Sequence, residues 1–402
     1  MRQATHEERN LKEHRTSLGI IFLIVFIDLV GFGIVIPILP LYGERFQPSG
    51  LTLGLLMASY SAMQFVFAPI LGRLSDRVGR RPVLLISLVG SVIGYLLFGF
   101  AGSMTVLFAA RIIDGISGGN IATAQAVIAD ITGPEERAKG MGILGAAFGL
   151  GFIVGPAVAA LLVDIQPWLP GVAAALTSTV AFTLVFFKLP ETLPEEARHE
   201  ARRHPLNFSS LSAVVGVHPL VALCFTAILL IIFAFSNFET VFAQFASAQH
   251  GLGISRIGWL FVYAGVLGAV VQGGMVGRLV KIFGEKKLVV GGTLIAALAV
   301  GAVPYPSSMA GLLAVLAALA LGQGLAAPSL SSLTSKLVRP DEVGGVMGIY
   351  QAFSSLARIF GPLVAELSYH IGYHWPFRVA AIAYFLAFGV SAILFRRAGL
   401  EV

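Results

Sequence analysis

The feature of this sequence that most constrains its fold is a succession of long apolar blocks. The first of them cover residues 18–41, 57–72, 82–100 and 106–129, and similar blocks continue toward the C-terminal end. A helix needs about 20 apolar residues to cross roughly 30 Å of hydrocarbon, and the blocks are close to that length. Strands of a membrane barrel would alternate polar and apolar residues over about 10 positions, and these blocks do not alternate. The sequence therefore predicts an all-α membrane protein.

Composition agrees with this prediction. Only 12% of the residues are charged and 56% are hydrophobic, whereas globular proteins have roughly 25% charged residues. The blocks predict twelve membrane-spanning helices. Their expected ranges are 17–42, 52–74, 82–101, 105–131, 140–163, 167–188, 218–244, 255–280, 288–306, 309–336, 344–369 and 374–395.

Missing motifs exclude several functional classes. The sequence has no G-x-x-x-x-G-K-[ST] phosphate loop, which an ATP-driven pump would need. It has no H-E-x-x-H motif and no Cys/His cluster, and its single cysteine, Cys224, excludes disulfides and thiolate metal clusters. We therefore expect no enzyme activity, no cofactor and no metal site.

The basic residues predict the orientation of the chain. If the N-terminus is cytoplasmic, 22 of the 27 Lys and Arg residues fall in the tails and loops on the inside, three fall outside and two lie within spans. Cytoplasmic loops of membrane proteins carry such an excess, so we expect both termini inside the cell inner (plasma) membrane. The net charge of +6 then reflects topology and anionic lipid, and it indicates no nucleic-acid partner.

The chain is expected to consist of two halves derived from one repeat. The charged stretch 190–205 separates six spans from six. When the sequence is shifted by 206 residues, 134–159 and 340–365 are identical at 12 of 26 positions. Parallel repeats of this kind occur in transporters, with the substrate site between the halves near the midplane. We predict two pseudo-symmetric six-helix bundles joined by a cytoplasmic linker, with boundaries at 1–188, 189–217 and 218–402.

The short loop between the second and third spans carries a dense motif. Residues 72–81 read GRLSDRVGRR and resemble the signature loop of the major facilitator superfamily, G-x-x-x-D-R-x-G-R-R, at every defining position. Gly72 is expected to let a neighbouring helix approach closely, and Gly79 to permit a sharp turn. In that family the aspartate and arginine form an inner-face charge network with an acid at the end of helix 4. The resemblance implies a conformational latch made of Gly72, Asp76, Arg77, Gly79, Arg80, Arg81 and Asp130.

The alternative to a latch is that the charges of this loop serve only to set the topology. The copy of the loop in the second half has Lys281 where the repeat would place Asp76, so we expect the latch to be asymmetric.

The fifth span contains a run of small residues. Gly145, Gly149, Gly151 and Gly155 leave a smooth groove for a close helix crossing, and Pro156 allows a bend. The run resembles the antiporter motif of drug-exporting facilitators, although this chain has Ala-Ala at 159–160 where that motif ends in Gly-Gly. Helix packing without a transport role is the alternative.

Residues 20–165 are similar to the tetracycline/proton antiporters and their drug-exporting relatives. The similarity rests on the segments 28–40, 61–69, 111–115 and 128–132. Where tetracycline antiporters carry an essential acid in helix 3, within an Asp-Tyr pair, this chain has Gly94-Tyr95. It has Asp114 in helix 4 where they have a small residue. This departure argues against tetracycline itself as the substrate.

Charged side chains inside the spans are the strongest candidates for function. Each costs about 2.5–3.5 kcal/mol at the centre of a bilayer, so such residues usually face a cavity. Asp28 and Glu239 have no partner nearby in the sequence, and we expect them to include the proton carrier. Arg111 and Asp114 are three residues apart and are expected to pair, either tuning the carrier or forming a structural bridge. Glu366 is expected at the outer surface as an ordinary acid.

These residues and the resemblance together predict a proton-coupled secondary transporter. It would export small hydrophobic or amphipathic compounds by alternating access, as a monomer in the lipid bilayer. A proton symporter or facilitator for a metabolite or sugar is the first alternative, and a membrane sensor on a transporter scaffold is the second. The candidate substrate-binding residues are Phe32, Met63, Gln64, Tyr95, Phe235, Phe238, Tyr263, Gln323 and Arg358.

The topology can be tested by labelling single cysteines introduced into a Cys224→Ser background. We expect a cysteine at position 200 to react only with reagent supplied from the cytoplasmic side, because basic loops stay inside. A cysteine in 246–254 should react from the outside and serves as the control. Labelling of position 200 from outside intact cells would contradict the predicted orientation.

Overall fold

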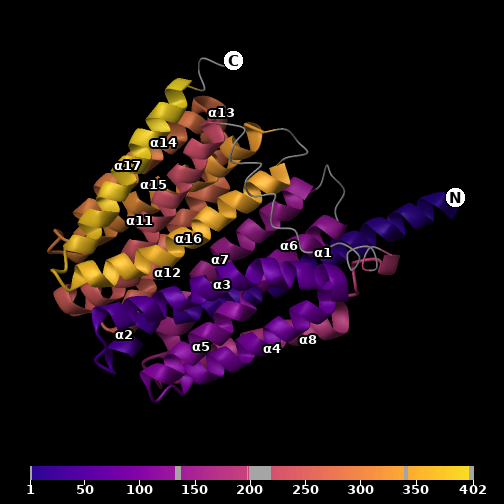
Figure 1. Cartoon of the computed structure of the whole chain (residues 1–402), viewed down its shortest axis with the longest axis horizontal. Helices are drawn as coiled ribbons and strands as arrows, with labels where there is room; N and C mark the ends of the chain where they lie inside the picture. Colours follow the sequence, from indigo (N-terminus) through magenta and orange to yellow (C-terminus); the bar gives the residue numbers. More distant parts are fainter. Residues whose placement is uncertain (1, 132–136, 197, 199–218, 339–342, 398–402) are drawn as a thin grey trace. The chain divides into compact units, whose positions relative to one another are not determined.

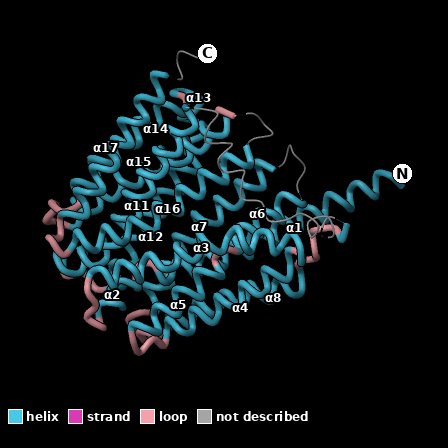
Figure 2. The backbone as a smooth tube through the Cα atoms, viewed as in Figure 1, coloured by secondary structure: helices cyan, strands magenta, loops and turns pink. Residues whose placement is uncertain are grey.

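The computed structural model describes residues 2–131, 137–196, 198, 219–338 and 343–397, which are coloured along the sequence in Figure 1. Over these residues the chain is almost entirely helical, and the described part contains no strand (Figure 2). Most of the predicted linker lies outside the described residues. The helices of the first half are α1 (Arg2–Val35), α2 (Leu39–Glu44), α3 (Gly50–Val78), α4 (Arg80–Gly99), α5 (Met104–Ser117), α6 (Asn120–Ile131), α7 (Arg137–Leu162) and α8 (Leu169–Lys188).

The second half has a similar series of elements. They are α11 (Pro219–His250), α12 (Ile254–Val270), the π-helical turn η1 (Val271–Met275), α13 (Val276–Phe283), α14 (Glu285–Ala302), α15 (Met309–Lys336), α16 (Val343–Tyr369) and α17 (Trp375–Arg397). Seven helices of the described part are long and apolar enough to cross a membrane, and Gly19–Val35 and Gly149–Leu162 are shorter apolar stretches. Every predicted span falls on one helix or on consecutive helices.

Three spans that the sequence predicts as single helices are interrupted. α1 ends at Val35 and α2 begins at Leu39, because Pro37 and Pro40 cannot donate backbone hydrogen bonds within a helix. α5 and α6 are separated by Gly118–Gly119. The predicted span 255–280 contains the π-helical turn η1 between α12 and α13, and such turns interrupt the regular α-helix.

The chain forms two compact units. The first consists of Met1–Pro37 and Met63–Pro205, and the second of Ile38–Ala62 and Leu206–Val402. The segment Ile38–Ala62, which contains α2 and the start of α3, therefore packs with the second unit. The predicted domain boundaries remain a prediction.

Both units repeat one packing pattern. In the first, α1 packs against α7 and α8, and α4 packs against α5 and α8. In the second, α11 packs against α16 and α17, and α14 packs against α15 and α17. Each pair in one unit corresponds to a pair in the other under the shift of about 206 residues, so the repeat in the sequence is a repeat in the fold.

Glycines allow α1 and α7 to cross closely in the first unit. A Cβ atom added to Gly155 would lie 2.6 Å from the backbone carbon of Gly33, and one added to Gly151 would lie 2.7 Å from the Cβ of Leu29. Gly149, by contrast, has no atom within 4 Å of such a position. The run of glycines therefore contains positions that the packing requires and at least one that it does not.

This difference predicts the outcome of two matched substitutions. Gly155→Ala should destabilise the protein by about 1–3 kcal/mol, because the backbones must separate to admit the methyl group. Gly149→Ala should be neutral or slightly stabilising, because alanine favours helix by up to about 1 kcal/mol over glycine. Thermal unfolding of the purified variants measures both, and equal effects would contradict the close crossing.

Candidate functional site

Asp28 lies in α1 and meets Asn120, the first residue of α6. The Asn120 side-chain amide donates a hydrogen bond to Asp28 Oδ2 at 3.1 Å, and Asn120 is 5% exposed. The other carboxylate oxygen of Asp28 is buried and has no hydrogen-bond partner in the described part of the protein. The break at Gly118–Gly119 places Asn120 at the start of a new helix, 92 residues from the acid that it contacts. Asp28 is thus held by one neutral group.

Arg111 and Asp114 form the ion pair expected from their spacing. Arg111 Nη1 lies 3.0 Å from Asp114 Oδ2, and the two residues are 5% and 3% exposed. Asp114 also has a side-chain hydrogen bond with Tyr95 of α4 and an electrostatic interaction with Asp28. We call Asp28, Asn120, Arg111, Asp114 and Tyr95 the N-terminal acid cluster.

The neighbour of Asp114 across the α4–α5 contact is Gly94. A Cβ atom added to Gly94 would lie 3.0 Å from the Cβ of Asp114 and 3.1 Å from the carbonyl oxygen of Ala110. Side chains at 94 and 114 therefore compete for the same space. An acid on α5 and an acid on α4 at these positions would occupy nearly the same place in the bundle.

The second unit has its own half-buried charges, each inside a predicted span. Glu239 of α11 interacts electrostatically with Arg358 of α16, and Arg358 also interacts with Tyr60 of α3. The Nε atom of Arg358 is buried and has no hydrogen-bond partner in the described chain. The acid that looks isolated in the sequence thus has a cation on a neighbouring helix.

Several of the predicted substrate-binding residues are buried or hydrogen-bonded within their own unit. Phe238 is 5% exposed and packs among other phenylalanines of the second unit's core, while Tyr95 is 3% exposed. Gln323 accepts a hydrogen bond from the hydroxyl of the fully buried Tyr384 at 2.7 Å, and the Gln64 amide donates to the carbonyl of Gly118 at 2.9 Å.

The other candidates are partly buried. Phe32 packs edge-on against Phe152 with ring centroids 6.0 Å apart, and Phe235 lies 6.2 Å from Phe238. Met63 and Tyr263 are half-buried.

Arg80, within the motif at residues 72–81, is the centre of an ion-pair network in the first unit. Arg80 is 7% exposed and forms an ion pair with Asp76. Its guanidinium also donates to Asp130 Oδ2 at 2.9 Å and to Ser75 Oγ at 2.7 Å. Three residues of the predicted latch are therefore in direct contact. Gly72 differs from the expectation, because a Cβ added there would meet only Ala122, at an ordinary 3.8 Å.

Sequence reasoning did not assign a role to Glu191, which completes this network. Gly79 has a φ of 118°, a conformation that favours glycine, and the chain turns there into α4. The backbone amides of Arg80 and Arg81 donate to the two Glu191 carboxylate oxygens at 2.9 and 3.2 Å. A carboxylate at this point satisfies free amides and interacts favourably with the helix dipole. Thr192 donates from its hydroxyl to Asp130 at 3.3 Å, so the segment that follows α8 joins the same network.

The second unit contains the corresponding contact with its charges exchanged. Glu285 forms an ion pair with Lys336 and accepts a hydrogen bond from Ser332 at 3.2 Å. A shift of 205 residues places Glu285 on Arg80, and a shift of 206 places Lys336 on Asp130. The hydrogen bond from Lys336 lowers the pKa of Glu285 below its ordinary value. The asymmetry expected for this loop therefore includes an inverted ion pair.

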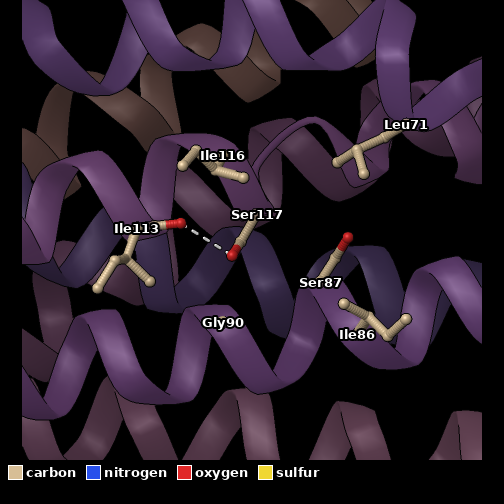
Figure 3. A pocket seen from close by; sticks show the side chains of 7 residues that line it. All are labelled: Leu71, Ile86, Ser87, Gly90, Ile113, Ile116 and Ser117. Carbon is tan, nitrogen blue, oxygen red and sulfur yellow. Dashed lines mark hydrogen bonds between the residues drawn. The ribbon is translucent and has the colours of Figure 1, made fainter.

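A pocket of about 200 Å³ opens between α3, α4 and α5 of the first unit (Figure 3). Ser117 faces it and donates its hydroxyl to the carbonyl of Ile113 at 2.9 Å, whereas the Ser87 hydroxyl has no partner among the described residues. Its other lining residues are apolar, so it suits a hydrocarbon group better than a charged one. Among the residues that the structure describes, no three His, Cys, Asp or Glu side chains come together in a way that could hold a metal ion.

Comparison with known proteins identifies the class and the family. The chain is 33% identical to the class D tetracycline resistance protein of Salmonella ordonez over 357 residues, which cover 86% of this chain and 87% of that protein. It is 27% identical to Multidrug resistance protein 2 of Bacillus subtilis over 388 residues, which cover 96% and 97% of the two chains. The crystal structure of the human organic anion transporter MFSD10 (TETRAN) aligns with a TM-score of 0.71 and 26% identity, covering 94% of this chain and 99% of that one.

The duplicated helical units and these relatives together define a multi-pass membrane transporter rather than an enzyme. The family profile described as Major Facilitator Superfamily matches residues 21–281 and 224–400. The chain belongs to the Major Facilitator Superfamily. This assignment confirms the all-α, twelve-helix fold class predicted from the sequence.

The inverted ion pair of the second unit can be tested by exchanging its charges. Glu285→Lys and Lys336→Glu should each lower stability by up to about 1 kcal/mol, because each places like charges together at a partly exposed contact. The double variant should recover the stability of the original protein. Thermal unfolding in low salt measures the effect, and a double variant no more stable than either single variant would contradict the pairing.

The same pair should depend on pH in a defined direction. Because the pKa of Glu285 is lowered in the folded protein, its contribution to stability is present near neutral pH. That contribution is lost as the pH falls through the lowered pKa. The difference in unfolding temperature between the original protein and Glu285→Gln should therefore vanish in acid.

Proposed function

We propose that this chain exports small hydrophobic or amphipathic compounds in exchange for protons, by alternating access between the two faces of the membrane. The observation that carries the proposal is the N-terminal acid cluster, in which two acids and one arginine lie together within a helical unit. The named relatives, which are multidrug and tetracycline resistance proteins, support this direction of transport. The substrate itself is a small molecule.

Asp28, Asp114 and Glu239 are the acids that we assign to proton coupling. Each is surrounded by apolar helices, where an anion is costly and a bound proton removes the charge. Arg111 and Arg358 offset this cost, one in each unit. A movement that changes the distance between an acid and its arginine would change the affinity of that acid for a proton. Substrate and proton need only favour different conformations for their movements to be coupled.

Asp114 is proposed to replace the acid that tetracycline antiporters carry in helix 3. The contact between position 94 and Asp114 supports this assignment, because a carboxylate on either helix would fill the same space. The pair with Arg111 and the hydrogen bond with Tyr95 would then hold the relocated acid in place. On this view the chemistry of the site is retained while its carboxylate has moved to a neighbouring helix.

Asp76, Arg80 and Asp130 are proposed to act as a latch on the cytoplasmic side that favours the outward-open state. The contacts of Arg80 with both acids support this role, since removing either acid leaves a buried guanidinium less well compensated. We infer that the chain works as a monomer in the inner (plasma) membrane with both termini in the cytoplasm. The distribution of basic residues supports that orientation.

The relocation of the acid gives a sharp test of the proposed coupling. Asp114→Gly should abolish efflux of a fluorescent cationic dye driven by an imposed pH gradient in proteoliposomes. Adding Gly94→Asp to that variant should restore part of the activity, because the carboxylate returns to the same space. Asp164→Asn changes an exposed acid and should leave transport unchanged.

Two results would contradict the proposal. If Asp114→Gly, Asp28→Asn and Glu239→Gln all transported against a gradient with unaltered pH dependence, none of these acids would carry the proton. If dye moved only down its own gradient in every variant and in the original protein, the chain would be a facilitator.

A further inference from the structure

Glu366 of α16 is not the surface acid that the sequence suggested. Its exposure is 1%, and its Oε1 atom is buried without a hydrogen-bond partner in the described part of the chain. The prediction of a surface position was wrong, because α3 and α11 pack against this residue. The proposed transport function makes no use of this carboxyl group.

The polar neighbour of Glu366 is a buried amide. Gln244 of α11 is 4% exposed, and its Nε2 atom lies 3.5 Å from Glu366 Oε2. The Oε1 atom of Gln244 has no partner among the described residues. Glu366 Oε1 and Gln244 Oε1 are therefore two buried acceptors without a hydrogen-bond donor among the described residues. An unsatisfied buried acceptor costs about 1–3 kcal/mol.

One proton would satisfy this arrangement. A protonated carboxyl group has one O–H donor and keeps an acceptor oxygen, whereas an amide has both donors and an acceptor. Glu366 could then donate to Gln244 Oε1 while it accepts from Gln244 Nε2, so that the two side chains form a doubly hydrogen-bonded acid–amide pair. The carboxylate form can make only one of these two bonds.

Other titratable groups around Glu366 do not neutralise it. Glu44 of α2 is a second acid that shares the Gln244 amide, and burial raises the pKa of Glu44 above its ordinary value. Tyr369 interacts electrostatically with both acids. His370, the residue that follows the end of α16, lies beside Gly50 at the start of α3.

Four cations on the surrounding elements have partners other than Glu366. Arg45 lies over the ring of Tyr42 at 4.7 Å, and Arg378 of α17 lies over the ring of Trp375 at 5.4 Å. Arg358 of α16 and Lys336 of α15 have the partners Glu239 and Glu285 that were described above. No ion pair to Glu366 occurs among the residues that the structure describes.

The start of α3 covers Glu366. A Cβ atom added to Gly54 would lie 3.3 Å from the Cβ of Glu366 and 3.2 Å from the carbonyl oxygen of Pro362. Gly54 thus permits α3 to lie directly against α16. This stretch belongs to Ile38–Ala62, the part of the first half that packs with the second unit. A movement of this segment away from α16 would uncover one side of the carboxyl group.

We propose that Glu366 and Gln244 form a second proton-binding site, which holds a proton while Ile38–Ala62 covers it and releases the proton when the cover moves. Burying the carboxylate without a cation is costly, so the covered state favours the neutral acid. By linkage, low pH should in turn favour the covered state. The site requires neither the N-terminal acid cluster nor any particular substrate.

Infrared spectroscopy of the purified full-length protein tests this proposal. The carbonyl band of protonated carboxyl groups should be present at neutral pH and should lose intensity in Glu366→Gln. Glu44→Gln, the matched control, should retain the Glu366 component. Gln244→Leu should shift the frequency of that component, because the hydrogen bond from the acid to the amide is lost.

Thermal unfolding supplies an independent readout. The unfolding temperature of the original protein should fall as the pH rises, because the buried acid loses its proton, and Glu366→Gln should be less sensitive to alkaline pH. A Glu366→Gln spectrum with undiminished carboxyl intensity would overturn the proposal, as would an unshifted band in Gln244→Leu. If Na⁺ stabilised the original protein at constant pH but not Glu366→Gln, the site would bind a metal cation and the proton assignment would be wrong.

Discussion

The free-energy cost of charge inside an apolar helical bundle is the constraint on which the rest of this structure depends. A charged side chain at the centre of a bilayer costs several kcal/mol, so it persists only where its neighbours offset that cost. Arg111 and Asp114 do so within one helix, and Asp28 relies on the neutral amide of Asn120. These contacts also explain a glycine on α4. A side chain at Gly94 would crowd Asp114, because its Cβ would lie 3.0 Å from the Asp114 Cβ.

The loop contacts show what the duplicated halves have kept. Arg80 pairs with Asp130 in the first unit, and Glu285 pairs with Lys336 at the corresponding positions of the second. The geometry of the contact is retained although the sign of every charge is reversed. In each unit the ion pair joins the first residue of one helix, α4 or α14, to a residue near the end of another, α6 or α15. The repeat therefore preserves an ion pair at these positions and not the identity of the residues that form it.

Periodicity and local spacing were sufficient to predict the spans, the repeat and the Arg111–Asp114 pair. Each of these depends on residues that are close in sequence or on a pattern that recurs along it. The contact between Glu191 and the amides at the start of α4 joins residues 110 positions apart, and no local pattern indicates it. The burial of Glu366 depends on α3 lying across α16 at Gly54, which is likewise a property of the fold. The amino-acid types identified candidate residues, and the packing decided which of them meet.

The central claim is that binding of an exported compound and binding of a proton are coupled through acids buried in the bundle. The most direct measurement is the pH change of a weakly buffered solution of purified protein when a transported dye is added near neutral pH. The account predicts net release of protons that saturates together with dye binding. Saturable dye binding without any proton release, across the pH range in which the protein transports, would contradict it.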